Sequence, residues 1–196
     1  MLTQKRLGTA ELLFKSAQKL GLEPSWIVPR GLFAVTSNGV EKYINLSHSP
    51  LNSQTAVSLA RNKHLTRLIL GRHSLPNIPF MRPKHHDEAT AFLALHGKII
   101  AKPTHGLGSQ DIHIIISPTQ LQALTVKKYI LEKYIAGTEM RYLVLNDAVI
   151  AVHRSEYGVS VAQDRYLERF SINEGNWDAD LVALSTTITT IAGLNI

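Results

Sequence analysis

The sequence predicts an α+β protein in which helices and strands alternate along the chain. Apolar residues make up 44% of the 196 residues and charged residues 18%, which is typical of a globular protein with a buried core. Stretches with helix-like apolar spacing alternate with stretches of strand-like spacing. An Asn38-Gly39 pair lies between two apolar runs, and this pair strongly favours a β-hairpin.

In the first half of the chain, residues 3–20 form the first predicted helix, because apolar side chains recur at three- and four-residue steps until Gly21. Residues 24–46 follow as strands around the Asn-Gly turn. The same helical spacing predicts a second helix over residues 52–70. Gly71 and three prolines then make residues 71–84 a linker or a short extended piece.

The second half of the chain is predicted to be richer in strands. Helices are expected at residues 89–96, 118–124 and 178–192. Strands are expected at residues 98–102, 111–116, 129–135, 140–145 and 148–153. A polar stretch, residues 156–177, separates the last strand from the last helix.

Several classes of protein are excluded or disfavoured by composition. The chain has no cysteine, which excludes a disulfide framework, a zinc ribbon and a thiol nucleophile. No apolar run approaches the roughly 18 residues of a membrane span, and no apolar segment follows the charged N-terminus as in a secretory signal. We therefore expect a cytoplasmic protein with no membrane partner.

The net charge of +6 is concentrated in one segment. Residues 42–86 hold seven Lys and Arg residues and no Asp or Glu, whereas the rest of the chain is close to neutral. Such a block indicates either a polyanionic partner or a solvated face. Nucleic acid, acidic lipid and nucleotide phosphates all fit this charge. Phe80 is the only aromatic residue between positions 44 and 86, which counts against a nucleic-acid groove.

The loop after Lys102 is the first candidate for chemistry. Gly106, Gly108 and the neighbouring Ser109 offer backbone N–H groups without obstruction, as in loops that bind phosphate. The loop matches neither the P-loop motif nor the dinucleotide-binding motif, so an ordinary hairpin loop remains the alternative. Lys102 ends an apolar strand just before this loop and would place an ammonium group beside a bound phosphate. A surface lysine is the alternative there.

The strand that contains Glu139 and Arg141 is the second candidate. If Asn146-Asp147 forms a two-residue turn, Arg154 lies opposite Glu139, and Arg141 lies opposite Val152. One carboxylate and two guanidinium groups would then share a patch suited to a polyphosphate. The alternative is a cross-strand ion pair worth at most about 1 kcal/mol.

No metal site is assigned. The run His85-His86-Asp87-Glu88 contains metal-binding residue types, but adjacent side chains point in different directions.

Four stretches, in this order along the chain, resemble the ATP-grasp superfamily. The likeness is to the amino-acid ligases related to cyanophycin synthetase and to the glutathione-synthetase half of the bifunctional glutathione enzymes. The stretches are residues 60–66 together with 75–79, residues 99–103, residues 106–108 and residues 131–141. The resemblance covers about residues 50–196, and it is most specific over the last stretch.

The resemblance implies an ATP-grasp fold, in which two α+β subdomains clamp ATP. An N-terminal α/β segment would occupy residues 1–75 and lead into a lid subdomain with the glycine flap at residues 76–128. Residues 129–196 would form a core subdomain that lacks its last strands. In the family, an acidic residue on one of those strands and a later Glu-x-Asn bind magnesium. We therefore expect the magnesium ligands beyond Ile196 and expect the chain to be truncated at the C-terminus.

The resemblance also implies roles for individual residues. Lys63 and Lys102 would contact the phosphates of ATP, under a flap containing Gly106, Gly108 and Ser109. The hinge residues Glu132, Lys133 and Ile135 would meet the adenine, and Glu139 would bind the ribose. Arg141 and Arg154 would lie near the transferred phosphoryl group and the substrate carboxylate.

The implied function is an ATP-dependent carboxylate–amine ligase that acts through an acyl phosphate. Its partners would be ATP, Mg²⁺ and small carboxylate and amine substrates, with no nucleic acid, and the protein could form a homo-oligomer. A non-catalytic ATP-binding or regulatory module is the alternative, and a basic nucleic-acid binder is the third.

Overall fold

The computed structural model describes residues 8–46, 48, 51–106, 110–137, 139–155, 166–171 and 179–192. It divides the chain into two compact units, residues 1–53 and residues 54–196, and each unit is described by itself. The sequence predicted divisions near residues 75 and 128 instead, and that three-part division stays a prediction.

The first unit is one helix packed on a small antiparallel sheet. Its elements are α1 (Thr9–Lys19), β1 (Ser25–Val28), β2 (Leu32–Ser37) and β3 (Val40–Asn45), and the strand order is β1-β2-β3. The rings of Phe14 and Trp26 stack at 4.4 Å, and both meet the buried ring of Phe33 edge-on. The predicted Asn38-Gly39 turn is confirmed, since both residues have positive φ and Ser37 pairs with Val40.

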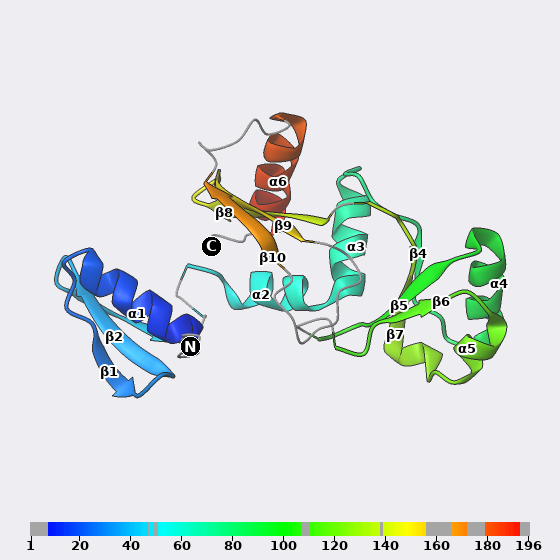
Figure 1. Ribbon diagram of the computed structural model, residues 1–196, viewed down its shortest axis with the longest axis horizontal. Coiled ribbons are helices and arrows are strands. Elements are labelled where there is room, and N and C mark those ends of the chain that lie inside the picture. The colour runs from blue at the N-terminus through cyan, green and yellow to red at the C-terminus, as the bar shows by residue number, and fades with distance from the viewer. Residues whose placement is uncertain are drawn as a thin grey trace. The chain divides into compact units, whose positions relative to one another are not determined.

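The second unit holds all the other elements (Figure 1). Its helices are α2 (Gln54–Arg61), α3 (Lys63–Arg72), α4 (His86–His96), α5 (Pro118–Gln122) and α6 (Ala179–Ala192), with a 3-10 turn η1 (Val126–Lys128). Its strands are β4 (Phe80–Met81), β5 (Ile99–Pro103), β6 (His113–Ile115), β7 (Tyr129–Lys133), β8 (Glu139–Leu145), β9 (Ala148–Ser155) and β10 (Tyr166–Ser171). They form two antiparallel sheets, β4-β7-β5-β6 and β10-β9-β8.

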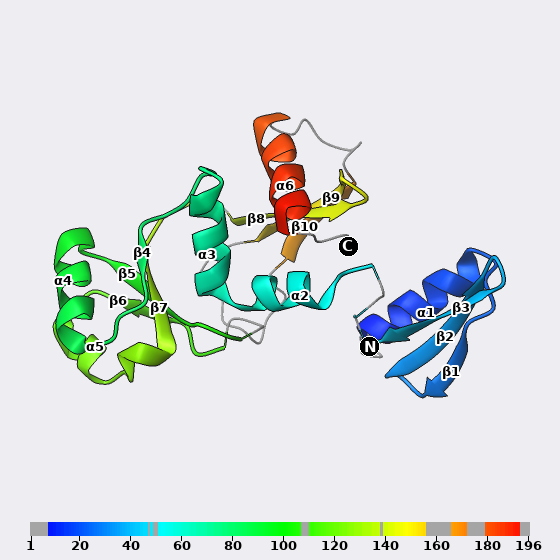
Figure 2. The same ribbon diagram turned by 180° about the vertical axis from the view of Figure 1, so that it is seen from behind.

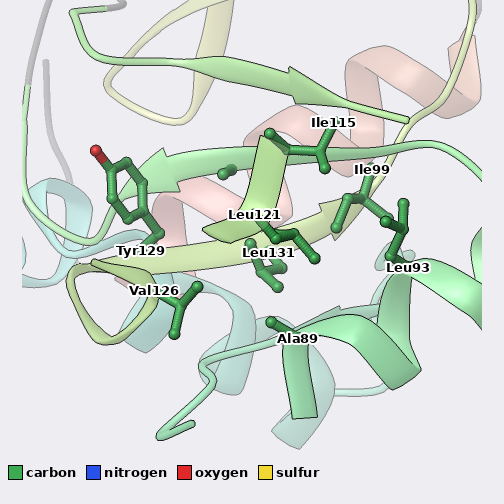
Figure 3. Close-up of a cluster of buried hydrophobic side chains, with 9 residues drawn as sticks. Ala89, Leu93, Ile99, Ile115, Leu121, Val126, Tyr129 and Leu131 are labelled. Carbon is green, nitrogen blue, oxygen red and sulfur yellow. The ribbon is translucent and has the colours of Figure 1, made fainter. Parts of the chain in front are cut away.

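The β4-β7-β5-β6 sheet has two different faces because side chains alternate along each strand. Ile99, Ala101 and Leu131 point to one face and form the largest apolar cluster with residues of α4, α5 and η1 (Figure 3). Helix α3 lies on the other side of this sheet, as Figures 1 and 2 show. The sheet is therefore packed on α4 and α5, and its second face is available for polar side chains.

The β10-β9-β8 sheet is covered by α6. Val144, Val149 and Val152 are buried there, and Val182 of α6 packs against them. The Asn146-Asp147 turn between β8 and β9 forms as predicted, with positive φ at both residues and Leu145 paired with Ala148.

The register predicted beyond that turn is wrong by one residue. Leu143 pairs with Ala151 and Val144 with Val149, so Ile150 is an extra residue that forms a β-bulge. Glu139 therefore pairs with Ser155, and Arg154 pairs with Met140. Arg141 likewise pairs with His153, whereas Val152 was predicted.

Two other expectations are corrected. The single helix expected over residues 52–70 is two helices, α2 and α3, which are separated at Asn62. The polar stretch at 156–177 contains the strand β10. Of the two alternatives for residues 71–84, the short extended piece forms, as strand β4.

Among helices in the described ranges, none combines the length and apolarity needed to cross a bilayer.

Candidate functional site

Helix α3 presents two cations on one side. Asn62 is its N-cap, since the side-chain oxygen accepts hydrogen bonds from the backbone N–H groups of His64 (3.1 Å) and Leu65 (3.2 Å). The helix therefore starts at Lys63, and the 3.6-residue repeat places Arg67 one turn further along the same side.

The sheet presents a lysine and a carboxylate opposite that helix. Lys102 pairs with Ile130 in β7, and Glu132 pairs with Ile100 in β5. Lys102 and Glu132 therefore lie two positions apart on the same face, which is opposite to the face that packs on α4 and α5.

These side chains meet at Glu132. Arg67 donates from Nε to Oε1 of Glu132 at 2.7 Å, and Lys102 donates from Nζ to Oε2 at 2.6 Å. The Glu132 side chain is only 2% exposed. Burial by itself raises the pKa of Glu132, but the hydrogen bond from Arg67 and the charge of Lys102 outweigh it and lower that pKa. Glu132 is therefore a buried, ionised carboxylate.

Asn77 fixes Arg67 in this position. Its side-chain oxygen accepts a hydrogen bond from Nη1 of Arg67 at 3.2 Å, and its Nδ2 donates to the Arg67 carbonyl at 2.8 Å. The guanidinium group is thus held from two sides, by Glu132 and by Asn77.

Lys63 ties helix α3 to the start of the glycine loop. Its backbone N–H donates to the carbonyl of Thr104 at 3.0 Å, and its Nζ donates to the carbonyl of Gly106 at 3.1 Å. The Asn62 amide donates to Nε2 of His105 at 3.1 Å. Partial burial and the positive charge of Lys102 lower the pKa of Lys63. The Lys63 ammonium is therefore near Lys102 and in contact with the loop.

The resulting arrangement has more positive than negative charge. Two cations, Arg67 and Lys102, contact one carboxylate, and a third cation, Lys63, contacts the backbone of the glycine-containing loop. Such a group of cations suits an anion with several oxygens, and a polyphosphate supplies them. We call Lys63, Arg67, Lys102 and Glu132 the Glu132 cluster.

The other described candidate residues, Lys133, Ile135 and Arg141, are exposed and do not belong to the Glu132 cluster. Lys133 is exposed at the end of β7, and its backbone N–H donates to the Pro79 carbonyl at 2.9 Å. Ile135 follows β7 and is 56% exposed. Arg141 is an exposed residue of β8, in the other sheet. Gly108 and Ser109, and the side chains of Glu139 and Arg154, lie outside the described residues.

Arg67 and Asn77 were not predicted from the sequence as site residues. The spacing of Lys63 and Arg67, one helical turn apart in a segment without acids, was the available signal for Arg67. No local sequence pattern indicates the role of Asn77. It contacts Arg67 only because the chain after α3 folds back along that helix.

The described residues show no cluster of candidate metal ligands. Within them, no group of three or more His, Asp or Glu side chains is close enough together to hold a metal ion. Magnesium needs carboxylate ligands besides substrate phosphates, and Glu132 is already engaged by two cations.

The chain is similar in structure to solved ligases, and this similarity identifies its fold. An ATP-grasp ligase, PsnB, in complex with a minimal precursor matches with a TM-score of 0.59 and 17% identity, over 76% of this chain and 49% of that one. The D-alanine–D-alanine ligase of Bacillus anthracis in complex with ATP matches with a TM-score of 0.54 and 12% identity, over 94% of this chain and 55% of that one. The chain has the ATP-grasp fold. No protein-family model and no curated protein sequence matches it.

A third match extends the same finding. The D-alanyl-alanine synthetase A of Vibrio cholerae matches this ATP-grasp chain with a TM-score of 0.52 and 16% identity, over 71% of this chain and 48% of that one. The chain spans about half the length of these structures. The mixed α+β architecture expected from the sequence is thus confirmed at the level of the fold.

Proposed function

We propose that this chain binds ATP and belongs to an ATP-dependent carboxylate–amine ligase. The observation that carries the proposal is the Glu132 cluster, in which Lys63 and Lys102 lie beside the start of a glycine loop in an ATP-grasp fold. PsnB and the D-alanine–D-alanine ligase are ligases, and the structure of the second is a complex with ATP.

In this proposal Lys63 and Lys102 hold the phosphates of ATP, with Gly106, Gly108 and Ser109 closing over them. Residues Glu132, Lys133 and Ile135 line the adenine, and Glu139 binds the ribose hydroxyls. Arg141 and Arg154 offset the charge of the transferred phosphoryl group and orient the carboxylate, where preorganised charge is the main source of rate enhancement.

The proposed reaction has two steps. An oxygen of the substrate carboxylate attacks the γ-phosphorus of ATP, which forms an acyl phosphate and releases ADP. The amine nitrogen then attacks the acyl carbon, the C–O bond to phosphate breaks, and an amide, inorganic phosphate and a proton are released. Mg²⁺ would assist phosphoryl transfer by binding the phosphate oxygens, and the described residues assign no ligand to it.

Protection by nucleotide tests the proposed ATP site. Thermal unfolding of the full chain should shift upward with ATP, since a ligand at a hundredfold excess over its Kd adds about 2.7 kcal/mol of stability. Lys102→Ala should lose most of this shift because the phosphates lose an ammonium group. Lys128→Ala removes an exposed lysine outside the cluster and serves as the matched control. If all three proteins melt alike with and without ATP, the site assignment is wrong.

Turnover separates the ligase from a non-catalytic module. A ligase releases ADP from ATP when a carboxylate and an amine substrate are supplied with Mg²⁺, whereas a regulatory module binds ATP without turnover. Amino acids and short peptides are the substrates to screen first. ATP protection without release of ADP across that screen would favour the module.

A further inference from the structure

A second basic site lies beside α3, apart from the Glu132 cluster. A cavity of about 370 Å³ is lined by His64, Arg82, Pro83, Lys84 and Lys127. We call it the Arg82 pocket. Its walls come from three parts of the fold, which are helix α3, the connection from β4 to α4, and the turn η1. The volume is within the range of small-molecule sites.

The lining of the pocket carries three cations and no acidic residue. None of the five lining residues is acidic, and none of the three cations has a salt-bridge partner among the described residues. The nearby carboxylate of Glu88 accepts a hydrogen bond from the backbone N–H of Lys84 at 2.6 Å. The charge of Lys84 also contributes to the lowered pKa of Glu88, so this carboxylate neutralises part of the charge of Lys84.

His64, which lines the pocket, carries a polar atom that the fold does not satisfy. Nδ1 of His64 is buried and has no hydrogen-bond partner in the described structure. The imidazole ring lies edge-on to Phe80 at 5.9 Å. An apolar residue would pack against Phe80 without the cost of a buried, unpaired nitrogen. The unpaired nitrogen of His64 is therefore expected to lower the stability of the fold at this position.

We propose that the Arg82 pocket binds a phosphate group of a small molecule. A phosphate carries a charge of about −1.5 to −2 at pH 7 and several acceptor oxygens. It can therefore accept hydrogen bonds from Arg82 and Lys84 on one wall and from Lys127 on another. A single carboxylate has one charge and two oxygens, and would leave part of the cation set unpaired.

This site is separate from the proposed ATP site. The pocket lining and the Glu132 cluster have no residue in common. His64 and Lys63 are adjacent on α3, and successive helical residues point about 100° apart. The inference does not depend on ligase activity, and its test uses no residue of the Glu132 cluster.

Titration of the full chain with potassium phosphate, followed by ¹H–¹⁵N NMR, tests the proposal. Potassium chloride keeps the ionic strength constant, so that screening alone produces no trend. The amides of Lys84 and Lys127 should shift and saturate. The Arg82→Gln/Lys127→Gln variant should raise the phosphate Kd at least tenfold and keep its thermal shift with ATP. The matched control Arg72→Gln/Lys128→Gln removes the same two residue types outside the pocket and should leave the phosphate Kd within twofold.

His64→Leu separates a binding role from a structural one. It should weaken phosphate binding while leaving the melting temperature equal to or above that of the wild type, because it removes an unpaired buried nitrogen. Shifts that do not saturate, or equal losses in both double variants, would overturn the proposal. Saturation with citrate but not with phosphate, or binding of an oligonucleotide without binding of free phosphate, would also overturn it.

Discussion

Glu132 is a carboxylate that the fold buries almost completely between Arg67 and Lys102. We expect Arg67→Gln to lower the free energy of unfolding by about 1.5–3 kcal/mol, the range for a hydrogen bond to a charged group. Lys102 would remain as the one counter-ion, so the loss stays below that of a fully unpaired buried charge. Urea unfolding of the two proteins gives the difference. Arg72→Gln, at the exposed end of the same helix, should change the free energy of unfolding by less than about 0.5 kcal/mol.

A double-mutant cycle shows whether Arg67 acts through Glu132. Arg67→Gln combined with Glu132→Gln should cost less than the sum of the single changes, because the charge that needed Arg67 is gone. Additive losses would mean that Arg67 acts mainly through Asn77, to which it also hydrogen-bonds.

The pH dependence of the free energy of unfolding should also reflect the ionisation of Glu132. The pKa of Glu132 is lowered in the folded protein from its ordinary value of 4.5. Its contribution is therefore fully present above pH 4.5 and is lost as the pH falls through the folded pKa. Arg67→Gln removes a cause of the lowering and brings the folded pKa closer to 4.5, so acidification should cost this variant less stability than it costs the wild type. Unfolding by urea across pH 3–7 measures this, and identical profiles for the two proteins would contradict the assignment.

At the level of elements, the position of Lys63 depends on how α3 begins. Asn62→Ala removes the N-cap and should cost about 1 kcal/mol of stability. It also removes the contact with His105, so ATP binding should weaken as Lys63 and the loop lose their common anchor. Asn62→Asp keeps the capping oxygen but loses the amide that donates to His105. It should retain the stability and lose only binding, and calorimetry of unfolding and of ATP binding separates the two effects.

The same elements show how far the sequence could predict this fold. The Asn38-Gly39 and Asn146-Asp147 turns formed as predicted because their signals are local. The bulge at Ile150 could not be predicted, since an extra residue in one strand leaves the apolar pattern of the hairpin almost unchanged. The end of α2 at Asn62 was missed because apolar spacing continues across it. Lys102 and Glu132 were expected in one site, but their contact depends on the register of β5 and β7, which no single-sequence pattern contains.

At the scale of the whole molecule, the described candidate residues for ATP lie in one of the two compact units. Lys63, Lys102 and Glu132 all belong to residues 54–196, whereas the aromatic cluster around Phe33 gives residues 1–53 a core of their own. Binding energy at the Glu132 cluster should therefore stabilise the second unit directly, and the first unit only through any coupling between them.

Hydrogen exchange of the full chain tests this division. With saturating ATP, amides in α3, β5 and β7 should exchange more slowly, because opening of these elements would have to break the nucleotide contacts. Amides in α1 and β2 should exchange at unchanged rates. Lys102→Ala should remove the protection of the second unit, and Lys128→Ala should preserve it. Protection that appears equally in α1 and β2 would show that the two units open together, and that ATP stabilises the chain as one cooperative body.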